Sequence, residues 1–125
     1  MIHPLQQTVL ILGAYNKPDR YAYKAFKMLR EKGHSCILVH PTLVELEHHP
    51  VIAHLSLVKE KVDTITIYVN PNISSDCESD IIRIHPSRVI FNPGSENPAL
   101  SKKLQENGIH VEEACTLVLL STNQF

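Results

Sequence analysis

The sequence has few cysteines and no excess of charge of either sign, and each shortage excludes a class of protein. Its three cysteines are odd in number and widely spaced, so we expect neither a disulfide framework nor a CxxC metal or redox site. Reduced thiols are typical of a cytoplasmic location. The formal net charge of -1 leaves no basic surface for nucleic acid, and no acidic block indicates a disordered tail.

Long apolar runs are missing as well. The run from Val9 to Ala14 is among the longest, and it has the size of a strand, far too short to cross a bilayer. Met1 to Gln7 has no apolar core, so we expect neither a signal peptide nor a membrane anchor there. A chain of 125 residues has the usual length of one domain, and we expect a single domain over residues 1–125.

What the sequence does contain is an alternation of strand and helix patterns. Short apolar or β-branched runs predict strands over residues 8–12, 36–39, 64–69, 88–91 and 109–111. Helices are predicted after Pro18, near 55–60, and over 75–84 and 98–107, whereas 42–54 looks irregular and 115–120 fits a helix or an edge strand. The alternation predicts an α/β fold: a single Rossmann-like, doubly wound domain with about five mainly parallel strands and helices on both faces.

Small or rigid residues follow four of the predicted strands. In order along the chain they are Gly13-Ala14, His40-Pro41, Asn70-Pro71 and Asn92-Pro93-Gly94. The carboxyl ends of parallel strands share one edge of the sheet, which is where such folds bind ligands. The sequence therefore predicts a ligand site at this edge, although each residue alone is also a common way to end a strand.

The first of these turns lacks the glycines of a dinucleotide site. The G-x-G-x-x-G pattern needs three glycines, but the stretch from Gly13 to Pro18 has only the first, and Tyr15 stands where a pyrophosphate needs bare backbone. The helix after Pro18, with Asn16 or Asp19 as its cap, would still direct N–H groups at this edge. With Arg20 beside it, this end of the helix favours a phosphate.

The pattern of residues 9–14, followed by Asn16, Pro18, Arg20 and Tyr23, resembles the CoA-binding domain family of small Rossmann proteins. That family is similar to the nucleotide-binding domain of the succinyl-CoA synthetase alpha subunit. The resemblance continues through Val39-His40-Pro41, Val62-Asp63, residues 91–98 and Cys115. It covers about residues 8–116, and the order and spacing of the motifs carry it together.

The resemblance implies CoA as the ligand and assigns residues to the parts of its site. The phosphate side would comprise Gly13, Ala14, Tyr15, Asn16, Pro18 and Arg20. The adenine side would comprise His40, Pro41, Val69, Asn70 and Pro71, with Asn92, Pro93 and Gly94 closing the pocket. Three positions depart from the family: Tyr15 replaces a small Ser, His40 replaces Asn, and Thr42 replaces a Lys that a phosphate could have used.

No catalytic constellation is visible. His48, His49 and His54 lack the spacing of a metal site, and we expect Cys115 to be a packed thiol, with a nucleophile as the alternative. We therefore expect a non-catalytic module that binds CoA or a related adenine nucleotide. The alternatives are an NAD(P)-dependent oxidoreductase-type domain and an interaction protein whose nucleotide site has degenerated, with Tyr15 filling the pocket. A homodimer or a partner protein, contacted through the apolar C-terminal segment, is compatible with all three.

Overall fold

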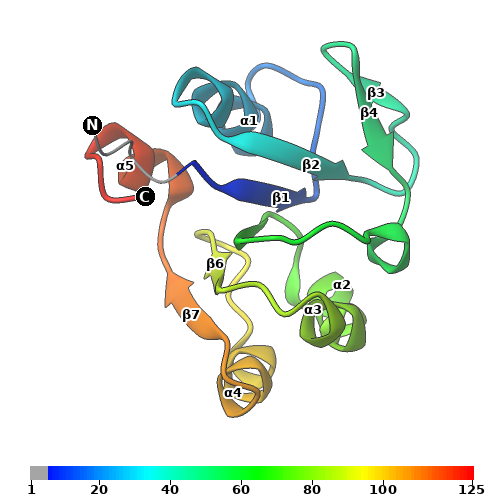
Figure 1. Ribbon diagram of the computed structural model, residues 1–125, viewed down its shortest axis with the longest axis vertical. Coiled ribbons are helices and arrows are strands. Elements are labelled where there is room, and N and C mark those ends of the chain that lie inside the picture. Colours follow the sequence, from blue (N-terminus) through cyan, green and yellow to red (C-terminus); the bar gives the residue numbers. More distant parts are fainter. Residues whose placement is uncertain (1–5) are drawn as a thin grey trace.

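The chain alternates between strands and helices except over residues 35–52, where three strands follow one another directly, and over residues 71–84, where two helices do (Figure 1). The computed structural model describes residues 6–125, so most of the N-terminal stretch expected not to be a signal peptide lies outside the described residues. The strands are β1 (Thr8–Leu12), β2 (Ser35–Val39), β3 (Glu45–Leu46), β4 (His49–Ile52), β5 (Thr64–Ile67), β6 (Arg88–Phe91) and β7 (His110–Glu113). The helices are α1 (Tyr21–Glu31), the 3-10 turn η1 (Leu55–Leu57), α2 (Pro71–Ser75), α3 (Glu78–Ile84), α4 (Pro98–Glu106) and α5 (Thr116–Ser121). Within residues 6–125, no helix is long and apolar enough to cross a membrane.

The strand order confirms the predicted Rossmann-like fold. The sheet runs β3-β4-β2-β1-β5-β6-β7, and every neighbouring pair is parallel except β3 and β4. When β3 is set aside, the parallel strands numbered along the chain read 3-2-1-4-5-6, the order of dinucleotide-binding folds. After β1, the strands β2 and β4 are added on one side of it, whereas β5, β6 and β7 are added on its other side. The direction of winding therefore reverses between β1 and β5, where such sheets bind ligands.

The prediction of an irregular segment over 42–54 is wrong. β3 and β4 form a hairpin there, and β4 pairs in parallel with β2, which gives seven strands rather than about five. At the hairpin tip, Glu47 and His48 have φ values of 50° and 67° without a glycine to announce a turn. Leu46 is buried, and the Tyr23 hydroxyl donates to Glu47 Oε2 at 2.6 Å, so contacts with α1 stabilise this hairpin.

One further boundary differs from the predictions. The helix expected over 75–84 begins only at Glu78, as α3, and a separate short helix, α2, precedes it over Pro71–Ser75. The segment 115–120, for which a helix and an edge strand were both open, forms helix α5. Cys115 lies at the N-cap position of α5 and is half-buried. Leu120 in the last turn of α5 is buried against the face of the sheet that α1 also covers.

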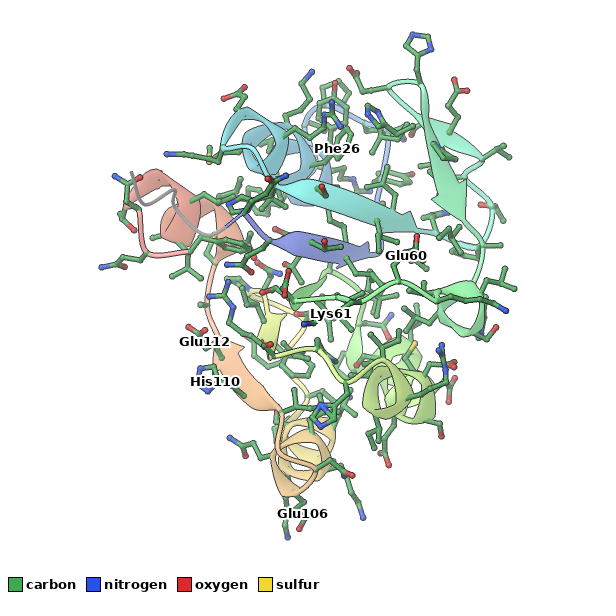
Figure 2. The ribbon with its side chains drawn as sticks, viewed as in Figure 1. Phe26, Glu60, Lys61, Glu106, His110 and Glu112 are labelled. Atoms are coloured by element: carbon green, nitrogen blue, oxygen red, sulfur yellow. The ribbon has the colours of Figure 1, made fainter. Side chains whose placement is uncertain are left out.

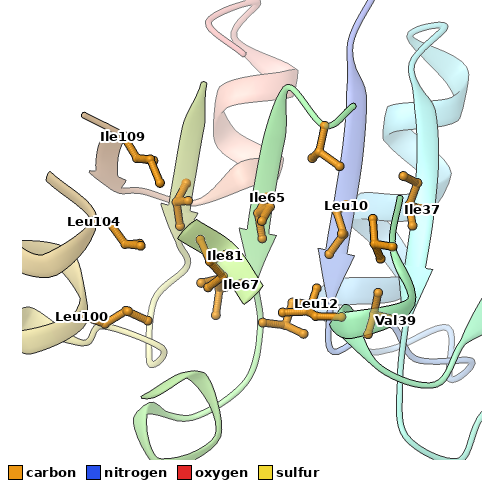
Figure 3. Close-up of a cluster of buried hydrophobic side chains, with 14 of the residues drawn as sticks. Leu10, Leu12, Ile37, Val39, Ile65, Ile67, Ile81, Leu100, Leu104 and Ile109 are labelled. Atoms are coloured by element: carbon orange, nitrogen blue, oxygen red, sulfur yellow. The ribbon is translucent and has the colours of Figure 1, made fainter. Parts of the chain in front are cut away.

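Two apolar layers flank the sheet. α1 and α5 lie side by side on one face, and the residues of this layer include Val9, Ile11, Phe26 and Leu29. α3, α4 and η1 cover the other face, where the alternate strand residues Leu10, Leu12, Ile65 and Ile67 meet Ile81, Leu100 and Leu104 (Figure 3). Each such side chain contributes about 1.5–3 kcal/mol relative to an exposed one. Both faces are covered, so the central strands are buried on both sides; β1 is apolar from Val9 to Leu12, whereas β5 alternates isoleucine with buried threonine.

The outer edge of the sheet is charged. Figure 2 shows His110 and Glu112 on β7, the last strand of the sheet. Glu112 Oε2 lies 3.3 Å from Arg88 Nη1 and 3.5 Å from His110 Nε2. The Arg88 guanidinium also lies 4.5 Å from the centre of the Phe125 ring. Charged side chains at an edge strand disfavour pairing with a strand of another molecule.

A buried polar network joins the ends of β5 and β6 to α5. Asn92 Nδ2 donates to Thr66 Oγ1 at 2.7 Å and to the Ile67 carbonyl at 2.9 Å. Asn92 Oδ1 accepts from the Thr116 amide at 2.9 Å, and the Thr66 and Thr116 hydroxyls are 2.8 Å apart. One asparagine side chain therefore bonds to groups on two other elements, and among the described residues it is the partner on which the buried Thr116 amide depends.

We predict that Asn92→Ala destabilises the protein by about 1–3 kcal/mol, because the buried Thr116 amide loses its partner, while the Ile67 carbonyl still accepts from the Ser95 hydroxyl at 3.0 Å. Urea unfolding measures the loss. Asn107→Ala is the matched control, since Asn107 is exposed and donates one bond to the Lys103 carbonyl, and it should cost less than about 0.5 kcal/mol. Equal losses in the two variants would contradict the structural role of Asn92.

Candidate functional site

A cleft of about 830 Å³ opens at the carboxyl edge of the sheet. It lies over the reversal between β1 and β5, and the segments that follow β1, β2, β4, β5 and β6 line it together with the first turn of α1. Its volume falls in the range of roughly 300–1,000 Å³ that small-molecule sites occupy. The predicted site residues that line it are Gly13, Tyr15, Arg20, His40, Pro41, Val69, Asn70 and Pro93.

The structure does not bring the other expected residues to the cleft wall. Ala14 is fully buried in the layer beneath α1, and Asn16 is exposed outside the cleft. Pro18 occupies the second position of a turn that the Arg20 amide closes by donating to the Lys17 carbonyl at 3.0 Å. The helix begins at Tyr21, so the expectation of Pro18 in its first turn is wrong.

Three further residues that were expected in the site, Pro71, Asn92 and Gly94, do not line the cleft, and the local structure explains each case. Pro71 is the first residue of α2, where its missing N–H costs nothing. The Asn92 side chain is used in the buried network. The Gly94 amide donates to Glu96 Oε1 at 2.9 Å within its own loop. These positions were predicted from residue type, and the same types also build turns and internal bonds.

Gly13 serves the packing of the strands at the base of the cleft. Its φ is 94°, and a Cβ built on it would lie 2.9 Å from Val69 Cγ1, closer than real side-chain contacts. Its amide donates to the Val39 carbonyl at 3.0 Å, as the Ala14 amide does at 3.1 Å. The turn after β1 is therefore held against the ends of both neighbouring strands, β2 and β5, and only glycine fits it.

Cations gather where α1 begins. Arg20 is the N-cap residue of α1, its side chain makes no capping bond, and no acidic residue occupies the first turn. Neither Asn16 nor Asp19 caps the helix, contrary to the prediction. The Arg20 guanidinium lies 5.2 Å from the centre of the Tyr15 ring, and Lys17 Nζ lies 5.8 Å from it. The positive end of the helix dipole and these side chains make this part of the cleft suitable for a phosphate.

Tyr15 and His40 form one wall of the cleft. Their ring centres are 5.9 Å apart with an angle of 31° between the planes. Tyr15 is half-buried and packs against the α1 layer, so it lines the cleft without filling it. His40 Nδ1 accepts from the Thr42 amide at 3.1 Å and from the Leu43 amide at 3.0 Å. His40 thus takes the acceptor role that an asparagine side chain plays in a turn.

Sequence reasoning missed the cleft residues that depend on unpredicted segments. Ala53, His54 and Leu55 follow β4, the strand that was not expected, and Ile73, Asp76 and Cys77 lie on and after α2. The other missed residues are Leu12, Asp19, Tyr21, Ala22, Val39 and Tyr68. The signal available for α2 was Asn70-Pro71, a cap followed by proline, which is a helix start as well as a strand end.

Two groups in the cleft keep their protons at neutral pH. Burial raises the pKa of Tyr68 to about 12, and its buried hydroxyl has no hydrogen-bond partner among residues 6–125. Burial also raises the pKa of the Cys77 thiol, and the carboxylates of Asp80 and Asp76 raise it further. Cys115 does not line the cleft. In the part of the chain that the structure describes, no cluster of three or more His, Cys, Asp or Glu side chains could hold a metal ion.

Solved structures of similar fold cover nearly the whole chain. An uncharacterized protein with a crystal structure is 40% identical, with 98% of this chain and 100% of that chain covered and a TM-score of 0.92. A protein of Thermus thermophilus, cell-free ID.343, is 29% identical over 96% of this chain and 91% of its own, with a TM-score of 0.87. The dinucleotide forming acetyl-coenzyme A synthetase 1 of Ca. Korarchaeum cryptofilum shares the fold, with a TM-score of 0.72 and 18% identity, over 84% of this chain and 25% of that chain.

The family comparison agrees with the motifs found in the sequence. The CoA binding domain matches residues 7–121, which include β1, the cleft segments and α5. The strand order and the cleft at the β1–β5 reversal are those of a Rossmann nucleotide-binding fold. This chain therefore belongs to the CoA-binding domain family.

Proposed function

We propose that this protein is a non-catalytic module that binds CoA or a related adenine nucleotide in the cleft at the carboxyl edge of the sheet. The observation that carries the proposal is the place of the cleft, at the β1–β5 reversal and in front of the N-terminus of α1. Phosphates bind where helix N–H groups and the positive dipole end converge. Membership of the CoA-binding domain family supports CoA as the ligand.

The cleft offers different chemistry at its two ends. Toward α1, Arg20 and the first N–H groups of the helix would hold the phosphates, with Tyr15 beneath them. Toward β2, His40 and Pro41 line the cleft, as Val69 does after β5, so this part would receive the adenosine.

Two alternatives receive less support. An NAD(P)-dependent oxidoreductase uses the same strand order, but the turn after β1 has only Gly13 of the three glycines, and Tyr15 occupies the close-approach position. A degenerate site filled by Tyr15 fits poorly with an open cleft of about 830 Å³ that has Tyr15 on its wall. Unpaired thiols at Cys36, Cys77 and Cys115 fit a reducing, cytoplasmic compartment.

Thermal unfolding with and without CoA tests the proposal directly. A ligand that binds only the folded state at a Kd of ~10 μM should add roughly 2.7 kcal/mol at 1 mM. For a domain of this size we expect CoA to raise the melting temperature by several degrees. ATP and NAD serve as comparison ligands. A shift with NAD alone would favour the oxidoreductase alternative, and no shift with any nucleotide would contradict the proposal.

Arg20→Ala should weaken CoA binding by about tenfold to a hundredfold, the range that the loss of one charge-assisted hydrogen bond to a phosphate implies. Arg30→Ala is the matched control, because Arg30 lies in the last turn of the same helix and outside the cleft. Isothermal titration gives both affinities. If a folded Arg20→Ala protein binds CoA as tightly as the wild type, the phosphates do not lie at α1.

Alkylation by iodoacetamide should be slow at Cys77 at neutral pH, since its raised pKa leaves little thiolate, and CoA should slow it further because Cys77 lines the cleft. Cys36 provides the internal control. Burial raises its pKa to about 11, and it lies outside the cleft, so CoA should leave its rate unchanged. Mass spectrometry of the labelled peptides reads both sites. Protection of Cys36 but not Cys77 would place the ligand elsewhere.

A further inference from the structure

His40 is fixed in place by its main chain and by its side chain. Its amide donates to the Ile52 carbonyl at 3.0 Å, which extends the pairing of β2 with β4 by one residue. Its Nδ1 accepts from the amides of Thr42 and Leu43. The ring also lies against Tyr15. A half-buried side chain held by these contacts has little freedom to turn, so its other ring nitrogen has a defined direction.

These bonds assign the proton of the neutral ring. Nδ1 receives two N–H donors and therefore acts as an acceptor, which leaves the proton on Nε2. In an imidazole ring Nε2 faces away from a partner of Nδ1, no bond of His40 Nε2 is seen among residues 6–125, and His40 lines the cleft. His40 therefore presents a neutral N–H donor at the cleft, directly after β2.

In folds of this strand order, the residue directly after the second strand lies beside the adenosine ribose of the bound nucleotide. Its side chain distinguishes a ribose hydroxyl from a ribose phosphate, because a carboxylate binds the hydroxyl and repels the phosphate. In this chain the place is taken by His40, an uncharged donor that can bond to either. CoA differs from dephospho-CoA only by a phosphate on the ribose 3′-oxygen.

We infer that His40 is a specificity-determining residue, whose Nε2–H donates to the 3′-phosphate of the bound adenosine and thereby admits a phosphorylated ribose. The inference rests on the proposed function, because it presumes an adenine nucleotide in this cleft. A hydrogen bond to a charged phosphate is stronger than one to a hydroxyl, so the wild type binds CoA several-fold more tightly than dephospho-CoA.

The test uses two substitutions that keep the turn intact. His40→Ala would remove the acceptor of the Thr42 and Leu43 amides, so a loss of binding could reflect a disordered turn. His40→Asn and His40→Asp both retain a side-chain oxygen for these amides and are favoured in such turns. They have the same shape and differ in charge and in the two N–H donors of the amide, so comparing them reports whether the phosphate lies against this side chain. Melting of the unliganded variants verifies that both fold.

His54→Asp controls for the general electric field of the cleft. His54 also lines the cleft and also accepts a backbone amide, that of Ser56, through Nδ1 at 3.1 Å, but it follows β4 rather than β2. A carboxylate there changes the charge of the cleft equally without occupying the position after β2.

The measured quantity is the ratio of the dissociation constants for CoA and dephospho-CoA, obtained by isothermal titration of the full-length protein. We expect His40→Asp to shift this ratio against CoA by about tenfold or more relative to His40→Asn, the size expected for a new like charge within contact range. His54→Asp should shift the ratio much less.

Two results would overturn the inference while the proposed function stands. One is an equal ratio in His40→Asn and His40→Asp, which means that the phosphate lies away from His40. The other is an equal shift in His40→Asp and His54→Asp, which means that the carboxylate acts through the general field. If the wild type binds neither nucleotide, the proposed function fails, and the assignment of His40 fails with it.

Discussion

The close approach of β1 and β5 at their carboxyl ends is the constraint on which the rest of the structure depends. Gly13 has a φ of 94°, and a Cβ there would lie 2.9 Å from Val69 Cγ1. A larger residue would push the turn away from β5, and the amides of Gly13 and Ala14 would leave the Val39 carbonyl. The winding of the sheet reverses at this pair of strands, so the residues that pack the ends of β1 and β5 together also form the base of the cleft.

Polar residues at the strand ends divide into two groups with different tasks. Asn92 and Asn97 point inward: Asn92 joins β5 to α5, and Asn97 caps α4 while its Nδ2 donates to Ser74 Oγ at 2.9 Å. Arg20 and His40 line the cleft. An asparagine carries a donor and an acceptor on one rigid group, so it can bridge backbone groups of two elements. The internal group fixes the segments after β5 and β6, whereas His40 and Arg20 are positioned by bonds within their own turns and to Ile52.

The sequence predicts the fold better than the site, for reasons visible in single residues. The apolar face of α1, with Phe26 and Leu29, has a regular period and was predicted correctly. β3 and β4 escaped prediction because they are short and because non-glycine residues make their turn. Asn92 was placed in the site because its type suits a ligand and an internal network equally well. Residue type alone does not tell the two roles apart, since the choice depends on neighbours brought from β5 and α5.

Two departures from the family pattern, Tyr15 and His40, are a single structural feature. In the sequence they lie in different turns, but in the structure their rings pack at 5.9 Å, and the guanidinium of Arg20 lies over the Tyr15 ring. A small residue at position 15 would leave both neighbours without this support. The Tyr15 ring contacts both the arginine and the imidazole, so it supports the side chains of two separate turns that line the cleft. Under the proposed function, this shared contact would hold the donors to the phosphates and to the ribose in fixed positions relative to each other.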